Sequence, residues 1–277
     1  MPTLTGGPDD TGEARDGRLL AWAVLVAALL QVIAPLITLN GPGGSPADGA
    51  GPDLLITPVG WAFSIWGVIY TLAIAQAVAV LLTGSQRIRP RLQVAQVVLY
   101  LGATGWIALA GLDRSIATAA ALAVMSAAAI DAVVTVARNS LTPKWLAALT
   151  RTAVGLYAGW VTAAFFLNVS TALVDAGAFE ADELTWQLSM LVLAVAALLA
   201  VAIAARGTLA YTAAGIWALV GIGVTGRIDG TGEVVVAAAV SIVLLCSATV
   251  AVRVARRRNG PRGGRLPEPA RRGLRPR

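Results

Sequence analysis

Eight long apolar runs, separated by short polar segments, account for most of this chain. A helix needs about 20 mostly apolar residues to cross a hydrocarbon layer about 30 Å thick, and in lipid its backbone groups must be hydrogen-bonded internally. We therefore predict an all-α, polytopic transmembrane helix bundle of about eight spans, in keeping with a mean hydropathy of +0.75. The predicted spans are Leu19–Leu39, Thr57–Thr83, Leu92–Leu112, Ser115–Ala137, Thr152–Val174, Trp186–Ala205, Thr208–Gly226 and Glu233–Val252.

The charges between the runs orient the predicted bundle. If the N-terminus is cytoplasmic, every one of the 21 basic residues except Arg114 and Arg227 falls on the inner side. The loops on the other side are acidic. This bias is what the positive-inside rule requires, so we expect both termini in the cytoplasm. The Ala- and Arg-rich composition suggests a bacterial genome, and hence the plasma membrane. The outer acidic residues are Asp48, Asp53, Asp113, Asp175, Glu180, Asp182, Glu183, Asp229 and Glu233.

The loops suggest how the chain is divided. An acidic loop, Asp175–Thr185, separates five front spans from three back spans. The longest outer loop, Asn40–Ile56, ends in apolar residues that we expect to lie over the bundle. The expected parts are a cytoplasmic N-terminal tail (1–18), a five-helix membrane domain (19–174), three additional helices (175–252) and a disordered, Arg-rich cytoplasmic tail (253–277).

The composition excludes several classes of function. The net charge of +6 comes from the C-terminal tail, so we expect that tail to attract anionic lipid headgroups and expect no nucleic-acid binding. The chain has no histidine and a single cysteine, Cys246. Cys/His zinc sites, histidine-ligated haem and Ser-His-Asp catalysis are therefore impossible. We expect no metal, no cofactor and no enzymatic activity.

Two spans carry aromatic stripes. At 100° per residue, Phe63, Trp66 and Tyr70 share one face of the second span, whose start we place at Thr57 as N-cap and Pro58 as first helical residue. Trp61 points nearly the opposite way, as an interfacial residue or as a ligand contact. Both stripes fit either bundle core or a binding site.

The fifth span has two distinct faces. We expect its stripe of aromatic, small and amide groups to face away from lipid, because an unpaired amide in hydrocarbon is costly. Gly155, Gly159 and Ala163 form a second ridge, suited to close helix packing. The stripe contains Tyr157, Trp160, Ala164, Asn168 and Thr171.

These motifs resemble the translocator protein/tryptophan-rich sensory protein (TspO/MBR-related) family. Its members carry Pro-Gly-Trp-x-Phe…Trp…Tyr at the start of their second helix and Tyr-x-x-Trp-x-x-x-Ala-x-x-x-Asn in their fifth. The chain matches the second pattern with its spacing. In the first pattern, Val59 replaces a proline, and the gap from Trp61 to Trp66 is one residue shorter than in the short, five-helix members. In the third helix, Ala103 stands where those members often have an asparagine three residues before the tryptophan. Three further spans follow, so the chain resembles a longer, divergent member.

The resemblance implies a five-helix bundle with a pocket closed by the loop after helix one. Family members bind tetrapyrroles such as protoporphyrin IX, sterols in animals, and synthetic ligands. The resemblance therefore implies that a hydrophobic, porphyrin-like ligand binds in an aromatic pocket between helices one to five, for sensing or transport. Without histidine, a metal-free macrocycle is favoured. The ligand-binding residues carried over are Trp61, Phe63, Trp66, Tyr70, Trp106, Tyr157, Trp160, Ala164 and Asn168.

Asp131 is the one ionisable residue well inside a predicted span, about 10 Å from its inner end. It is a candidate for proton coupling, or it pairs with Arg138 or with an arginine of the Arg87–Arg91 loop. The alternatives to a ligand-binding protein are thus a proton-coupled exporter or permease that uses Asp131, and a scaffold or homodimer with Gly155, Gly159 and the basic tail as contact surfaces. Four glutamines are expected to hydrogen-bond between helices: Gln31, Gln76, Gln93 and Gln96.

Overall fold

The computed structural model describes residues 9–38, 52–112 and 114–259. Within these ranges the chain forms eight α-helices, each long and apolar enough to cross a membrane, and no strand. The predicted all-α fold and the number of spans are confirmed. The elements are α1 (Asp9–Thr38), η1 (Gly60–Ser64), α2 (Ile65–Thr83), η2 (Ser85–Arg87), α3 (Pro90–Ala110), α4 (Ser115–Arg138), α5 (Lys144–Asp175), α6 (Leu184–Ala204), α7 (Leu209–Ile228) and α8 (Gly232–Arg258).

Three helices extend well beyond the predicted apolar spans. α1 begins at Asp9, α5 begins at Lys144, and α8 continues to Arg258. α1 and α8 thus run into the segments expected as tails, 1–18 and 253–277. Residues 253–258 are helical rather than disordered, whereas the cytoplasmic placement of residues 1–18 stays a prediction. The helices continue because arginine, alanine and glutamate favour helix and can remain solvated beyond the hydrocarbon. Residues 1–8 and 260–277, where the rest of these tails was expected, lie outside the described residues.

The start of the second span also differs from the prediction. Thr57 is not an N-cap and Pro58 is not helical, because a 3₁₀ turn, η1, begins only at Gly60. The preceding chain is extended and is held by its neighbours. The backbone N–H of Val59 donates to the carbonyl of Gly221 in α7 at 3.2 Å, and that of Thr57 donates to the carbonyl of Leu54 at 2.9 Å. One tertiary hydrogen bond and one turn hydrogen bond thus replace helical ones there.

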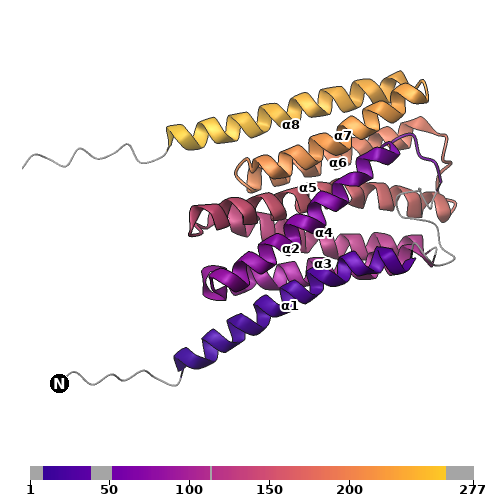
Figure 1. Ribbon diagram of the computed structural model, residues 1–277. Coiled ribbons are helices and arrows are strands. Elements are labelled where there is room, and N and C mark those ends of the chain that lie inside the picture. Colours follow the sequence, from indigo (N-terminus) through magenta and orange to yellow (C-terminus); the bar gives the residue numbers. More distant parts are fainter. Residues whose placement is uncertain (1–8, 39–51, 113, 260–277) are drawn as a thin grey trace, which may run out of the picture.

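The bundle is built around α5, which packs against α2, α4, α6 and α7. α1 lies on α2 and α3 at one edge, and α8 lies on α6 and α7 at the opposite edge (Figure 1). The beginning of α1 and the end of α8 lie at the same end of the bundle (Figure 1). That end holds the turn between α2 and α3, whereas residues 52–59 lie at the other.

The glycine ridge of α5 is covered by α7. A Cβ atom added at Gly159 would clash with the backbone carbonyl of Tyr211 and lie 2.9 Å from the Cβ of Ala214. One added at Gly155 would lie 2.8 Å from the Cβ of Ala210. The predicted close packing is confirmed. The same contacts overturn the idea that these glycines form a surface for another protein, because α7 already occupies it.

Buried polar groups link the front helices. The side-chain amide of Gln96 in α3 donates to the side-chain oxygen of Gln76 in α2 at 2.8 Å. The hydroxyl of Tyr157 in α5 donates to the side-chain oxygen of Gln31 in α1, also at 2.8 Å. These contacts confirm the prediction for these glutamines. Gln93 instead donates to the carbonyl of Ser85 at 3.3 Å, in the connection between α2 and α3.

Candidate ligand-binding cavity

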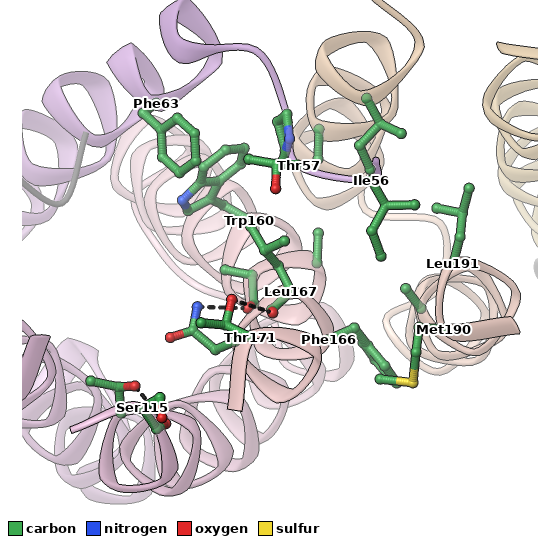
Figure 2. A pocket seen from close by; sticks show the side chains of 18 of the residues that line it. Ile56, Thr57, Phe63, Ser115, Trp160, Phe166, Leu167, Thr171, Met190 and Leu191 are labelled. Carbon is green, nitrogen blue, oxygen red and sulfur yellow. Dashed lines mark hydrogen bonds between the residues drawn. The ribbon is translucent and has the colours of Figure 1, made fainter. Parts of the chain in front are cut away.

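A cavity of about 690 Å³ opens among the helices at the end of the bundle where residues 52–58 lie. Its volume is in the range of small-molecule sites, about 300–1,000 Å³. Figure 2 shows part of its wall. The cavity is lined by Pro52, Asp53, Ile56, Thr57 and Pro58 before η1; Phe63 and Trp66; Trp106 and Ala110; Arg114, Ser115 and Thr118; Trp160, Ala163, Ala164, Phe166, Leu167, Asn168, Thr171 and Asp175; Met190, Leu191, Ala194 and Leu198; and Ala218, Leu219 and Ile222.

The cavity does not lie between helices one to five, as the resemblance implied. Helices α6 and α7 form one side of it, and none of the described residues of α1 lines it. The reason is the glycine ridge, which lets α7 approach the backbone of α5 and brings α6 and α7 beside its outer half. α1 instead packs on α2 and α3, and its Gln31 accepts a hydrogen bond from Tyr157, which does not line the cavity.

The loop after α1 covers the cavity. Leu54 and Ile56 are buried, at 3% and 4% exposure, and Ile56 lines the wall (Figure 2). This confirms that the apolar end of the loop lies over the bundle. Residues 39–51, the rest of the predicted loop, lie outside the described residues.

One side of the cavity is aromatic. The ring of Phe63 meets that of Trp160 edge to face, with centroids 5.7 Å apart. Trp66 lies 5.8 Å from Trp106 and 6.1 Å from Trp160. Edge-to-face contacts of this kind hold rings at fixed angles. Four rings from α3, α5 and the η1–α2 segment therefore form a rigid apolar surface.

The indole N–H of Trp160 is the unpaired polar group of this surface. Trp160 is 2% exposed, and its Nε1 has no hydrogen-bond acceptor among the described residues. A buried donor without a partner costs about 1–3 kcal/mol. The neighbouring tryptophan shows the contrast: Nε1 of Trp106 donates to Oδ1 of Asn168 at 3.1 Å. The amide of Asn168 donates in turn to the carbonyl of Ala164 at 3.1 Å.

The structure brings together Phe63, Trp66, Trp106, Trp160, Ala164 and Asn168 of the predicted ligand-binding set. Three others do not line the cavity. Trp61 is 46% exposed and packs edge to face on Trp217 of α7, because the 3₁₀ turn directs it away from the aromatic side. Tyr70 stacks on Trp66, with centroids 5.3 Å apart, and Tyr157 is buried behind both, against Tyr100.

The open end of the cavity carries charge. Asp53, Arg114 and Asp175 line it there and are exposed. Trp160 precedes Asp175 by four turns of the same helix, so it lies about 22 Å deeper at 1.5 Å per residue. The cavity thus leads from a polar rim to a deep aromatic surface.

Several of the lining residues carry no distinctive sequence signal. The rim residues come from three separate segments, and the lining residues of α6 and α7 are ordinary apolar residues of apolar spans. Phe166 and Leu167 lie in the fifth-span motif, but their own positions were not singled out. In α7, Trp217 is the one residue whose type indicates a specific contact, because tryptophan is uncommon among small residues in the middle of a span.

Asp131 lies away from the cavity. It forms an ion pair with Arg91 of α3, whose Nε lies 3.0 and 3.1 Å from the two carboxylate oxygens and whose Nη2 contacts Oδ1. This is one of the pairings predicted for it. The side chains are 32% and 74% exposed, respectively. Asp131 follows Ser115, which lines the cavity, by about 24 Å along α4.

Comparison with known proteins agrees with the motifs. The family model described as TSPO-like protein matches residues 18–252, which include the aromatic stripes and all three back helices. No curated protein and no solved structure matches the chain. Since the family match covers most of the sequence, this multi-pass membrane protein belongs to the TSPO-like protein family.

Proposed function

We propose that the protein binds a planar, hydrophobic small molecule of the tetrapyrrole type in this cavity, for sensing or transport. The observation that carries the proposal is the unpaired indole N–H of Trp160 within a buried aromatic surface. An acceptor atom on a ligand would satisfy that donor, and the rings of Trp66, Trp106 and Phe63 would contact a flat apolar body.

The chemistry of the residues favours a macrocycle without a metal. The sequence has no histidine, so imidazole cannot ligate a metal at its centre. A tetrapyrrole with acidic side groups would place them at the rim, where Arg114 is available, and its ring in the apolar interior. We propose binding without chemical conversion, since most of the described lining residues are apolar.

The arrangement in the membrane follows from charge. We propose that the beginning of α1 and the end of α8 face the cytoplasm of a bacterial cell and that the cavity rim faces outward, as the positive-inside rule indicates. The arginines after α8 would then lie near anionic headgroups. A homodimer would use a surface other than the glycine ridge.

Proton-coupled transport receives less support from the structure. Asp131 is paired with Arg91, partly exposed, and remote from the cavity. A paired carboxylate at the end of a bundle stabilises a helix contact without needing to exchange protons. The scaffold alternative loses its proposed contact surface at Gly155 and Gly159.

The test is titration of the detergent-solubilised protein with protoporphyrin IX, following tryptophan quenching. We expect saturable binding that Trp160→Phe weakens about tenfold, because a hydrogen bond and part of a stacking surface are lost. Trp61→Phe is the matched control: it removes one tryptophan outside the cavity, and affinity should stay at the wild-type value. Quenching that rises linearly and equally in all three proteins would contradict the proposal.

A further inference from the structure

The side of the cavity opposite the aromatic surface is aliphatic. It is formed by α6 and α7, and its members are buried: Leu191, Ala194, Leu198, Ala218, Leu219 and Ile222. Figure 2 shows Phe63 and Trp160 on one side of the cavity and Met190 and Leu191 on the other, with Leu167 between. We refer to the six buried residues as the aliphatic wall.

The two sides offer different contacts. The aromatic side has fixed rings, one unpaired N–H and the amide of Asn168. The aliphatic wall has no polar side chain and combines two alanines with larger apolar residues. A rigid ring seated against Trp160 leaves this wall uncovered. A flexible hydrocarbon chain can cover it, and burying the chain there is favourable.

Direct contacts between α7 and η1 connect the aliphatic wall to the aromatic side. Nε1 of Trp217 in α7 donates to the carbonyl of Ala62 in η1 at 2.7 Å, directly before Phe63. A Cβ added at Gly221 would lie 2.9 Å from that of Ala62 and 3.0 Å from that of Pro58, so α7 and η1 are in close contact. The aliphatic wall therefore keeps a fixed distance from the aromatic side, and both parts of a ligand would be bound by one preformed site.

We infer that the ligand is an amphiphile made of a planar ring and a flexible aliphatic chain, with the ring on the aromatic side and the chain along the aliphatic wall. The inference rests on the proposed function and adds the chain. It also assigns a role to the three back helices: α6 and α7 supply the chain site, and α8 supports them from outside.

Two probes with the same macrocycle test this. Methyl pheophorbide a carries a methyl ester, and pheophytin a carries a phytyl ester at the same position. In wild type we expect pheophytin a to bind at least roughly tenfold more tightly, since each buried CH₂ adds to affinity. The measurement is tryptophan quenching in detergent at a fixed detergent concentration.

Variants on one helix locate the chain. Ala194→Leu fills the aliphatic wall, whereas Ala196→Leu puts the same side chain on an exposed position of α6. Ala194→Leu should abolish the advantage of pheophytin a over methyl pheophorbide a, and circular dichroism checks that the variant is folded. Ala196→Leu should preserve the advantage. Ala218→Val repeats the test from α7, in case Ala194→Leu does not fold.

The outcomes separate the two proposals. Equal affinity of both probes in wild type, or an advantage that survives Ala194→Leu and Ala218→Val, would overturn the chain site while leaving ring binding intact. If neither macrocycle binds saturably, the proposed function fails and the chain site fails with it.

Discussion

Two polar side chains of this bundle, those of Trp160 and Asp131, have opposite surroundings. In the cavity, the indole N–H of Trp160 is deeply buried and has no partner among the described residues. Away from the cavity, the carboxylate of Asp131 is partly exposed and is fully engaged by Arg91. Burial without a partner is costly and indicates a missing partner, whereas an exposed ion pair is complete in itself. The comparison separates a binding site from a structural contact, and an ionisable residue in a span is not by itself the better candidate.

The largest expected effect comes from separating α5 from α7. Gly159→Val should place its side chain against the backbone of Tyr211, which cannot move without displacing α7. We expect the free energy of unfolding to fall by at least about 3 kcal/mol and ligand binding to be lost. Thermal unfolding monitored by circular dichroism in detergent measures the first effect.

A matched control separates the loss of the α5–α7 contact from the effect of replacing a helical glycine by valine. In Gly67→Val the same side chain is added to α2, at a position where a Cβ would meet nothing within 4 Å. Its unfolding temperature should stay close to that of wild type. Equal destabilisation by both substitutions would show that the α5–α7 contact is not what shapes the cavity.

A smaller effect is expected from the hydrogen bond that α7 makes to η1. Trp217→Phe removes the donor to the carbonyl of Ala62 and leaves most of the ring contact with Trp61. We expect protoporphyrin IX affinity to fall about two- to tenfold, since a hydrogen bond of this kind contributes about 0.5–1.5 kcal/mol. Trp145→Phe, at an exposed position of α5, is the control and should bind as wild type. A wild-type Kd for Trp217→Phe would mean that α7 does not position the aromatic side.

The smallest effect is expected at Asp131. Asp131→Asn removes the ion pair with Arg91, about 24 Å along α4 from the cavity. Both groups reach solvent, so stability should change little and protoporphyrin IX affinity should not change. Proton-coupled transport predicts the opposite result. If vesicles containing wild type take up protons when ligand is added, and vesicles containing Asp131→Asn do not, then Asp131 is not merely a structural contact.

The sequence predicted the parts of the site that carry a distinctive period. Trp160, Ala164 and Asn168 fall on one face of a helix, and an amide on that face could not be left in lipid, so their inward direction was predictable. Periodicity also directed Trp61 away from Phe63, Trp66 and Tyr70, as the structure has it. Its place among the ligand-binding residues came from the resemblance, and in the 3₁₀ turn of residues 60–64 it packs on Trp217 of α7.

The aliphatic wall could not be predicted for a physical reason. In a membrane protein, residues facing lipid and residues facing an apolar cavity have the same composition, so Leu191 and Ala194 look like their lipid-facing neighbours. The rim residues Asp53, Arg114 and Asp175 lie far apart in the sequence and meet only through the fold. The glycine ridge predicted that a helix packs on α5 but not that the helix is α7.

The most direct test observes the indole N–H of Trp160 itself. With ¹⁵N-labelled tryptophan and the protein in lipid nanodiscs, the eight tryptophans give separate indole N–H resonances, and Trp160→Phe identifies the one from Trp160. On addition of protoporphyrin IX we predict that the Trp160 resonance moves the most, with smaller changes at Trp66 and Trp106 and none at Trp22 or Trp145, which are exposed. An unmoved Trp160 resonance at saturating protoporphyrin IX, or changes confined to the exposed tryptophans, would contradict ligand binding in this cavity.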